Sequence, residues 1–589
     1  MKTKNILFRY VWIIFLFAFP QSGYVLAMDI WMASSYENIF QDELKVADKE
    51  SFHLVMAKNE AESFQILLRS EEDFTIHSVE LKELKGETGV ISSGHITYNY
   101  VEYVFMSKNS IHQDTRYLIR NGAGFYPDPL SNDTEIEVKA NRTQPIWITV
   151  QTPSDCKAGV YTGIAEIQTD KANYSVKYTV EVGDVIIPDS HCANFDFMHH
   201  QQIAGTWFYD AERGNHPRDV ITQLYGWKRW TPQWWELLED MALKLKQSRC
   251  NVLFVNTQQL LLDAAGTDLI NGKYSFDWSK FDEYIHFFMD RKVIGKMEGI
   301  HFGSTIGEVG KTYKSYILTK NEKGILCSKN VDPMTSECSG FFDQFLPALY
   351  EHLKAKGWEN RWIQHVGDEA VSDLQHQQYA YYMDKISGLA PGMHCGDPTF
   401  SLKSGLNAVE RGANVVIPIE ELYQEYKTGF DSLKNEGVKI YVYNCCGPGN
   451  EWLNRFIDKP VWQQRSLGWL CYKWGIPGWL HWGWNFWVDW FEDSLHTIEE
   501  EGFKGDHYSV YPDLKNNKIK NSIRQTAVRD MSEDYELLLI LGKKNPEAAL
   551  ELVNEIAVNA SGNYTSDINS MVHTRNRLVR AFGEKDGRK

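Results

Sequence analysis

The spacing of apolar residues changes near residue 188, and this change constrains the fold more than any other feature of the chain. From residue 28 to about 187, apolar and polar residues alternate in segments such as 63–68 and 144–150, which are separated by turn residues. Alternation is typical of strands that bury one face. The sequence therefore predicts a β-sandwich domain over residues 28–187, followed by a linker at Pro188-Asp189-Ser190.

Beyond the linker, short apolar runs alternate with helical patterns, as in chains that build a parallel sheet from strand–helix units. We interpret residues 191–520 as a (β/α)8 barrel of the TIM type, with strands at 195–199, 251–256, 293–302, 361–367, 392–397, 414–420, 439–444 and 478–485. A doubly wound open sheet is the alternative. No glycine-rich phosphate loop opens any of the intervening helices, so neither a nucleotide site nor a cofactor is expected.

Three connections in this segment are long, at residues 203–230, 303–336 and 487–520, whereas connections in a minimal barrel have about 2 to 6 residues. Long connections at one rim of a barrel form the walls of a pocket. The last segment, residues 521–589, has a helical and charged pattern, and we expect a short helical C-terminal extension with a packing role. The predicted fold is a multidomain α/β protein.

The first 27 residues have the pattern of an export signal. Lys2, Lys4 and Arg9 precede an apolar stretch that ends near Phe19, and small residues allow cleavage after Ala27. The stretch is shorter than the roughly 18 apolar residues of a membrane-spanning helix, although an uncleaved N-terminal anchor is the alternative. We therefore predict an exported protein, periplasmic or extracellular, without a membrane span.

Acidic residues outnumber basic ones. The chain has 78 Asp and Glu residues against 61 Lys and Arg residues, which gives a formal net charge of −17. Because nucleic acids and anionic membranes bind mainly to basic patches, neither is expected as a partner. The sequence does not indicate the oligomeric state.

The cysteines and histidines do not predict a metal site. The nine cysteines are scattered, with no Cys-x-x-Cys pair and no spacing typical of zinc ligands, and only Cys445 and Cys446 are adjacent. Most are expected to be thiols buried in a core. His199 and His200 are neighbours on a predicted strand, so they face opposite sides and do not easily bind one ion.

Adjacent carboxyl groups end the fourth predicted strand. Asp368 and Glu369 follow His365-Val366-Gly367 at the rim where active sites of this fold lie. Two carboxyl groups in different environments can divide catalysis, because one stays ionised and stabilises positive charge while the other donates a proton. The structural alternative is that Asp368 caps the next helix, with Glu369 in its first turn.

An aromatic run, 479–487, lies on the eighth predicted strand and its exit. Indole rings at a barrel rim suit the C–H faces of a sugar, so Trp482 and Trp484 are candidates for a stacking surface. Core filling is the alternative, because alternation places Leu480 with Trp482 and Trp484 on one face and Asn485 on the other. The pattern leaves open whether these indoles line a cleft or a core.

Other strand ends deliver polar groups to the same rim. Tyr443 and Asn444 end the seventh predicted strand, Asp397 ends the fifth and Asn485 ends the eighth. We regard all four as candidates for substrate binding, although Asp397 before Pro398 is also a frequent turn residue. Serine and cysteine occur in no nucleophile-elbow or triad pattern, which disfavours acyl transfer.

Several motifs together resemble glycoside hydrolase family 123. They are W-I-T-V-Q-T-P at 147–153, A-G-V-Y-T-G at 158–163, V-G-D-E-A at 366–370, W-G-W-N-F-W at 482–487 and G-D-H-Y-S-V-Y-P at 505–512, followed by I-R at 523–524 and R-D-M-S-E-D-Y-E at 529–536. The resemblance spans nearly all of the chain after residue 27. This chain has Gly505-Asp506-His507 where the family more often has G-D-G.

The resemblance implies a β-N-acetylgalactosaminidase that acts on glycans, including those of glycosphingolipids, by a retaining, substrate-assisted mechanism. The 2-acetamido oxygen of the substrate would attack the anomeric carbon, so no enzyme nucleophile is needed. Asp368 would orient the acetamido group and stabilise the oxazoline-like intermediate, and Glu369 would protonate the leaving oxygen and later activate water. The alternatives are a non-catalytic glycan-binding protein and a related hydrolase with another sugar or linkage specificity.

Overall fold

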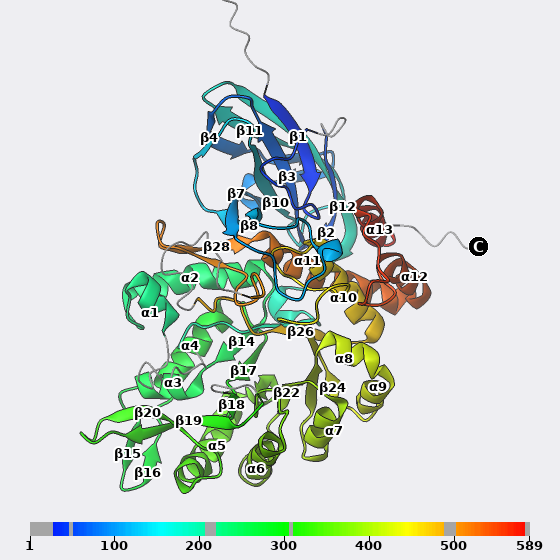
Figure 1. Ribbon diagram of the computed structural model, residues 1–589. Helices are drawn as coiled ribbons and strands as arrows, with labels where there is room; N and C mark the ends of the chain where they lie inside the picture. Colours follow the sequence, from blue (N-terminus) through cyan, green and yellow to red (C-terminus); the bar gives the residue numbers. More distant parts are fainter. Residues whose placement is uncertain (1–27, 46–50, 206–218, 306–309, 488–501, 584–589) are drawn as a thin grey trace, which may run out of the picture.

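The computed structural model of the chain describes residues 28–45, 51–205, 219–305, 310–487 and 502–583 (Figure 1). The predicted export signal, residues 1–27, lies outside the described residues, as do parts of the three long connections, at 206–218, 306–309 and 488–501. Figure 1 shows a β-rich N-terminal part above a mixed α/β part, with the C-terminal helices beside the junction.

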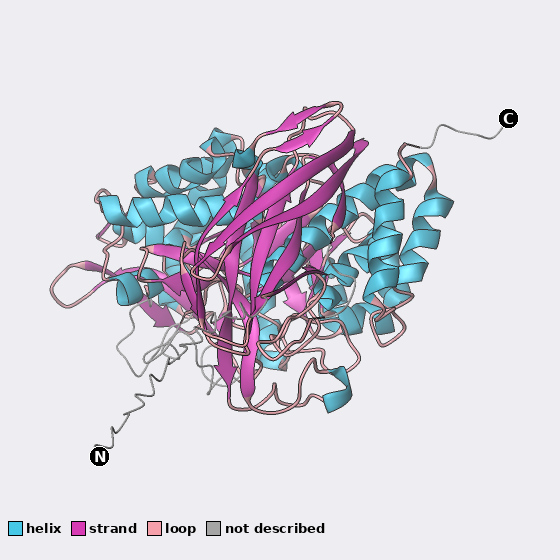
Figure 2. Ribbon diagram, turned by 90° about the horizontal axis from the view of Figure 1, so that it is seen from above, coloured by secondary structure: helices cyan, strands magenta, loops and turns pink. Residues whose placement is uncertain are grey.

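Two β-sheets form the N-terminal domain, as the alternating pattern predicts. The first has the order β1-β3-β10-β7-β8-β28-β27, with bounds Asp29–Ser34, Ala61–Arg69, Thr143–Gln151, Ile96–Met106, Gly124–Ser131, Lys518–Ser522 and Tyr511–Asp513. The second has the order β2-β12-β11-β4-β9, with bounds His53–Lys58, Asn173–Ile186, Gly159–Thr169, Phe74–Leu81 and Ile136–Val138, and β5 (Leu84–Gly86) and β6 (Gly89–Ile91) lie beside β11. Apolar side chains of both sheets, such as Phe64, Ile148 and Val180, form one buried cluster. Figure 2 shows this domain from above.

The first sheet takes its last two strands from a distant part of the sequence. β28 pairs antiparallel with β8, so that Asn521 lies opposite Leu130 and Ser522 opposite Pro129, and β27 pairs with β28. The sequence prediction includes most of these two strands in the barrel segment that ends at residue 520. Periodicity indicates that a strand forms, but it does not reveal which sheet the strand joins.

The α/β part has strands at all eight predicted runs. A six-stranded sheet has the order β21-β17-β14-β13-β26-β25, with bounds Trp362–Gln364, Lys296–Gly299, Val252–Val255, Asp196–His199, Gly478–His481 and Val442–Tyr443. A three-stranded sheet contains β22 (Gly396–Thr399), β23 (Val415–Pro418) and β24 (Lys439–Ile440). All strand pairs in both sheets are parallel, which confirms the mixed α/β class.

The closed (β/α)8 barrel predicted from the sequence is not confirmed. The larger sheet forms half a barrel, and the smaller sheet is joined to it through the isolated parallel bridges Gln364–Cys395 and Ile419–Tyr443. The physical reason is the shortness of the strands. With β24 and β25 of two residues each and β21 of three, few ladder hydrogen bonds form across the two seams.

Helices surround the parallel strands. They are α1 (Val220–Tyr225), α2 (Pro232–Gln247), α3 (Thr257–Asp263), α4 (Ser279–Asp290), α5 (Ser336–Lys356), α6 (Asp373–Leu389), α7 (Leu402–Glu410), α8 (Glu420–Glu425), α9 (Lys427–Asn435) and α10 (Trp462–Trp474). α2 illustrates why they form, because Trp234, Leu238 and Leu245 recur on one face and are all buried. Short strands β15 (Asp268–Ile270), β16 (Lys273–Ser275), β18 (Ser304–Thr305), β19 (Tyr313–Lys320) and β20 (Leu326–Val331) form two small separate sheets.

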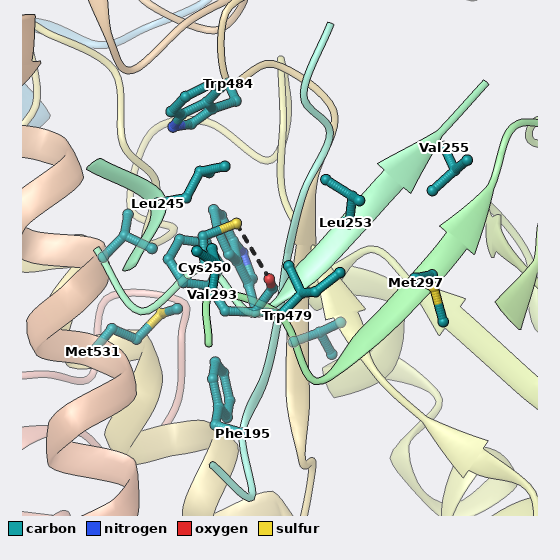
Figure 3. Close-up of a cluster of buried hydrophobic side chains, with 14 of the residues drawn as sticks. Phe195, Leu245, Cys250, Leu253, Val255, Val293, Met297, Trp479, Trp484 and Met531 are labelled. Atoms are coloured by element: carbon teal, nitrogen blue, oxygen red, sulfur yellow. Dashed lines mark hydrogen bonds between the residues drawn. The ribbon is translucent and has the colours of Figure 1, made fainter. Parts of the chain in front are cut away.

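The C-terminal segment forms α11 (Ile523–Lys544), α12 (Pro546–Ile556) and α13 (Ile568–Arg580). Met531 of α11 reaches a cluster of buried side chains from the α/β part that includes Phe195, Cys250 and Trp479 (Figure 3). The thiol of Cys250 donates a hydrogen bond to the carbonyl oxygen of Phe197 at 3.6 Å. The tail thus completes a core instead of extending into solvent. Within the described residues, none of the helices has the length and apolar character needed to span a membrane.

Candidate active site

Asp368 and Glu369 lie just beyond the carboxyl end of β21. Gly303 and Gly367 form a parallel bridge there, and the backbone N–H of Asp368 donates to the carbonyl oxygen of Gly303 at 3.0 Å. A Cβ atom at Gly367 would lie 2.9 Å from a ring carbon of Tyr313, so glycine is what lets the chain pass this ring. The strand end and the tyrosine together determine where the two carboxyl groups project.

The helix that follows the pair has a different cap. α6 begins at Asp373, and the side chain of Ser372 accepts a hydrogen bond from the backbone N–H of Gln375 at 3.2 Å, within a capping box. The alternative interpretation, in which Asp368 caps this helix with Glu369 in its first turn, is therefore wrong. Neither carboxyl group is needed for the start of the helix.

Glu369 combines an unusual backbone with a short hydrogen bond. Its φ of +45° lies in the left-handed region, which costs energy for a residue with a Cβ atom and is common at functional sites. The hydroxyl of Tyr443 donates to its Oε1 at 2.6 Å. Burial, followed by the charge of Asp368, raises the pKa of Glu369 to about 8. Glu369 is therefore protonated at neutral pH.

Asp368 lies in a different electrostatic environment. Burial and then the charge of Asp397 raise its pKa to about 7, while the charge of His365 opposes this shift. The Nε2 atom of His301 lies 3.9 Å from its Oδ1. Burial thus raises the pKa of both acids, and the charge of His365 favours the ionised form of Asp368.

A buried chain of charged groups lies behind the pair. The Nε2 atom of His365 donates to Glu298 Oε2 at 3.0 Å, and its Nδ1 lies 3.6 Å from Asp397 Oδ1. Burial alone would lower the pKa of His365, but these two acids outweigh it and raise the pKa to about 10. In turn, His200 and His365 outweigh burial at Glu298 and hold its pKa at about 2. His365 is thus a buried cation whose charge favours ionised Asp368.

Asp397 supports the turn that carries the acid pair. Its side chain is buried, and Oδ1 accepts the backbone N–H groups of Val366 and Gly367 at 2.9 and 3.1 Å. Burial raises the pKa of Asp397, while the nearby imidazole of His365 opposes the shift. These contacts give Asp397 a positioning role, and its direct contact with a substrate stays a prediction.

Trp482 is half-buried at the same rim. Its Nε1 donates to Asp506 Oδ2 at 3.0 Å, and the ring of His507 meets the indole edge-on, with ring centroids 4.8 Å apart. The indole also packs on a cluster between the parallel strands that contains Tyr443 and Leu480. The plane of Trp482 is therefore fixed from several sides, as a stacking surface for a sugar requires.

Trp484 lies in the core. None of its surface is exposed, and Figure 3 shows it in the same cluster as Trp479. Core filling, the alternative left open by the sequence, is the role that these contacts give to Trp484. Alternation failed to separate it from Trp482 because β26 ends at His481, so the two indoles are not on one strand.

Asn444 and Asn485 are enclosed beneath the rim. The side-chain oxygen of Asn485 accepts from the backbone N–H of Gln202 at 2.7 Å. Its side-chain nitrogen donates to the backbone carbonyl oxygen of Gln202 at 3.3 Å. The side-chain oxygen of Asn444 accepts from Trp479 Nε1 at 3.2 Å. Both residues are fully buried, so these hydrogen bonds join neighbouring strand ends to each other. Contact of either amide with a substrate stays a prediction.

Sequence reasoning did not find several groups that surround the pair, namely Glu298, His301, Tyr313 and Asp506. A charged residue inside a buried apolar run, as at Glu298, is the one signal that could have indicated a role. His200, Glu298 and His365 could each offer a ligand atom to a metal, with the three atoms within 4.8 Å of one another. Their observed contacts are those of an ion pair. His199 points elsewhere, with Nε2 2.9 Å from the carbonyl oxygen of Gly483.

The site has two neighbouring acids of raised pKa beside a positioned indole at the carboxyl ends of parallel strands. Two carboxyl groups in this position are typical of glycoside hydrolases. The chain belongs to glycoside hydrolase family 123, as the resemblance in its motifs implies. The family model described as Glycoside hydrolase 123, catalytic domain, matches residues 215–541, and the Glycoside hydrolase 123 N-terminal domain matches residues 34–169. No curated protein matched the chain.

One solved structure supports the fold. A family 123 glycoside hydrolase from Clostridium perfringens, studied for glycolipid glycan hydrolysis, is 16% identical, with a TM-score of 0.72, and the match covers 94% of this chain and 97% of that one. A GH20 exo-β-N-acetylglucosaminidase from Vibrio harveyi is 9% identical over 71% of this chain and 81% of that one, with a TM-score of 0.22. The first likeness supports the fold, and the second score is too low to support an argument.

Proposed function

We propose that this family 123 glycoside hydrolase is an exported enzyme that removes β-linked N-acetylgalactosamine from glycans by substrate-assisted retention. The observation that carries the proposal is the acid pair, in which burial keeps Glu369 protonated at neutral pH while Tyr443 holds its carboxyl group in place. The C. perfringens relative, studied for glycolipid glycan hydrolysis, supports a glycan of this kind as substrate. Export is supported by the pattern of residues 1–27 alone.

In the proposed reaction, Glu369 gives its proton to the glycosidic oxygen while the bond to the anomeric carbon breaks. The acetamido oxygen of the sugar attacks that carbon, and ionised Asp368 accepts the acetamido N–H and stabilises the positive charge. Glu369, now a carboxylate, takes a proton from the water that opens the oxazoline ring. Each of the two attacks inverts the anomeric carbon, so the overall reaction retains its configuration, and both acids return to their starting state.

The proposal includes a complete (β/α)8 barrel as the frame of the site. It is supported by the isolated parallel bridges at both seams between the two sheets, Gln364–Cys395 and Ile419–Tyr443. In such a frame the ends of all eight strands face one cleft. Trp482 would form the floor on which the sugar stacks, with Asp397, Asn444 and Asn485 as supports below it.

A matched panel of nitrophenyl glycosides tests the function. We expect rapid release of nitrophenol from the β-N-acetylgalactosaminide and much slower release from the β-N-acetylglucosaminide and the β-galactoside. The unacetylated galactoside lacks the internal nucleophile, so equal turnover of this sugar would exclude substrate assistance. Binding of N-acetylgalactosamine without hydrolysis of any substrate would favour the glycan-binding alternative. An N-terminus at Met28 in protein recovered outside the cytoplasm would verify export.

A further inference from the structure

Two adjacent thiols lie beside the catalytic pair and have no part in the proposed reaction. Cys445 and Cys446 follow Tyr443, the residue bonded to Glu369, and their Sγ atoms are 3.6 Å apart. Cys445 is buried in the cluster that contains Tyr443 and against which Trp482 packs, whereas Cys446 is exposed. The pair therefore connects the interior of the site with solvent.

The turn that carries the thiols is fixed by its own contacts. The side-chain amide of Asn454 donates to the carbonyl oxygens of Cys445 and Pro448, both at 2.9 Å, and the N–H of Cys445 donates to the carbonyl oxygen of Gly447 at 2.8 Å. Consecutive Cα atoms are about 3.8 Å apart, below the roughly 4.4 Å at which disulfides normally begin. A bond between these two sulfurs would therefore have to move this turn.

The exposed thiol is the better nucleophile of the two. The hydrogen bond from Cys445 lowers the pKa of Cys446, and the same bond raises the pKa of Cys445. The charge of a thiolate at Cys446 also raises the pKa of Glu369. A chemical change at Cys446 therefore alters the pKa of Glu369.

We propose that Cys445 and Cys446 are a modification site that reacts with low-molecular-weight disulfides and closes to a vicinal disulfide at the edge of the cleft. The Cys446 thiolate first attacks one sulfur of the oxidant, which forms a mixed disulfide and releases a thiolate. The Cys445 thiol then loses its proton, attacks Cys446 Sγ and expels the second thiolate. The pair loses two electrons and two protons, and the oxidant is reduced to two thiols.

Closure also has a consequence for catalysis. It moves the turn next to Tyr443 and withdraws the Cys446 thiol from the rim, so hydrolysis slows until a reductant reopens the bond. This effect on turnover rests on the proposed glycosidase activity, whereas the thiol chemistry does not. The two are therefore measured separately.

Mass spectrometry tests the thiol chemistry. The folded full chain is incubated with oxidised glutathione, free thiols are alkylated, and the peptide with both cysteines is weighed. We expect this peptide to lose the mass of two hydrogen atoms and to take up no alkylating reagent. A stable glutathione adduct on Cys446, or an unmodified pair in a sample where exposed Cys192 carries an adduct, would overturn the proposal.

Matched variants test the link to turnover. Cys446→Ser and Cys192→Ser each remove one exposed thiol, and each variant is compared with its own untreated sample on the nitrophenyl β-N-acetylgalactosaminide. Oxidation should cause a several-fold, reductant-reversible loss of kcat/KM in the unmodified chain and in Cys192→Ser, and none in Cys446→Ser. Equal loss in Cys446→Ser, or closure without any change in turnover, would overturn the placement of the pair at the cleft. If no form hydrolyses any glycoside, the proposed function fails and the peptide masses still decide the thiol chemistry.

Discussion

Two buried groups of acids in this protein differ in what lies opposite them. Where the sandwich meets α10, α11 and α13, Glu62 faces the guanidinium groups of Arg465 at 2.5 Å and Arg575 at 3.2 Å. Beyond β21, Asp368 lies 3.9 Å from the imidazole of His301, and Glu369 accepts from the hydroxyl of Tyr443 at 2.6 Å. The first group joins two domains, and the second lies beyond the carboxyl end of a parallel strand.

The contrast shows how the partners of a buried acid decide whether its pKa is lowered or raised. Burial raises the pKa of Glu62, but the charges of Arg465 and Arg575 outweigh it and hold the value at about 2. At Asp368 the charge of His365, and at Glu369 the hydrogen bond from Tyr443, do not outweigh burial, which raises the two pKa values to about 7 and 8. A carboxylate held by arginines stays ionised, whereas an acid facing weaker partners can exchange a proton at neutral pH.

The largest effect on stability is expected from Glu62→Gln. Removal of this charge leaves Arg465 and Arg575 buried with one partner fewer, and breaking a buried ion pair in this way costs about 3 to 5 kcal/mol of unfolding free energy. Because the folded pKa of Glu62 is depressed, its stabilisation is present above about pH 4.3 and is lost as the pH falls toward 2. Urea unfolding at several pH values measures the loss of unfolding free energy and its dependence on pH. Asp184→Asn, which removes an exposed partner of Lys58, is the control and should change little.

Glu369→Gln removes the proposed proton donor and should reduce kcat/KM on a natural disaccharide by about 10²- to 10⁴-fold. Activated nitrophenyl glycosides should be spared, because their leaving oxygen scarcely needs protonation. The measurement is kcat/KM of this variant on both substrates. Tyr443→Phe removes only the hydrogen bond to Glu369, so its loss of kcat/KM should be smaller. An equal loss on both substrates would show that Glu369 is not the general acid.

Asp368→Asn should reduce kcat/KM about 10²- to 10³-fold on both kinds of substrate, because it removes charge stabilisation that is needed whatever the leaving group. The folded protein should not lose stability. Since the folded pKa of Asp368 is raised, its ionisation costs stability as the pH rises from about 4 to 7, and the neutral amide avoids this cost. Thermal melts at pH 8 should show an equal or higher Tm. A fall in Tm like that of Glu62→Gln would make Asp368 a structural residue.

The pH dependence of kcat/KM should be bell-shaped and narrow. Activity rises as Asp368 ionises near pH 7 and falls as Glu369 loses its proton near pH 8, with slopes of about tenfold per pH unit outside these limits. On a natural disaccharide, whose leaving oxygen needs protonation, Glu369→Gln should lose the alkaline limb and keep the acid limb at its lower rate. A profile that stays flat from pH 5 to 9 would contradict the assignment of both acids.

The smallest effect compares two indoles from one sequence motif. Trp482→Phe loses the hydrogen bond to Asp506 and part of the stacking surface, so sugar binding should weaken by about 1 to 3 kcal/mol with little change in Tm. Trp484→Phe changes a core position, so it should lower Tm and leave KM unchanged. Steady-state kinetics and thermal melts on both variants decide the matter. The reverse pattern would place Trp484 in the cleft.

Much of the site could be predicted because its key residues are neighbours in the chain. Asp368 and Glu369 stand together at the end of one apolar run, and the sequence therefore identifies the acid pair without knowledge of the fold. It could not identify the cap of α6, because both Asp368 and Ser372 are residues that cap helices well. The difference between them depends on where the turn after β21 ends, and that depends on the packing of Tyr313 against Gly367.

By itself, the sequence determined the β-rich first domain, the positions of the parallel strands and the acid pair, because each depends on the order of residues within a short segment. Tertiary structure alone decided that β28 joins the sandwich, that Trp484 lies in the core, and that Asp506 holds Trp482. It also placed the cation of His365 behind Asp368. The physical reason is that burial, charge and hydrogen bonding act between segments that are distant in the chain, and these interactions leave no periodic pattern in the sequence.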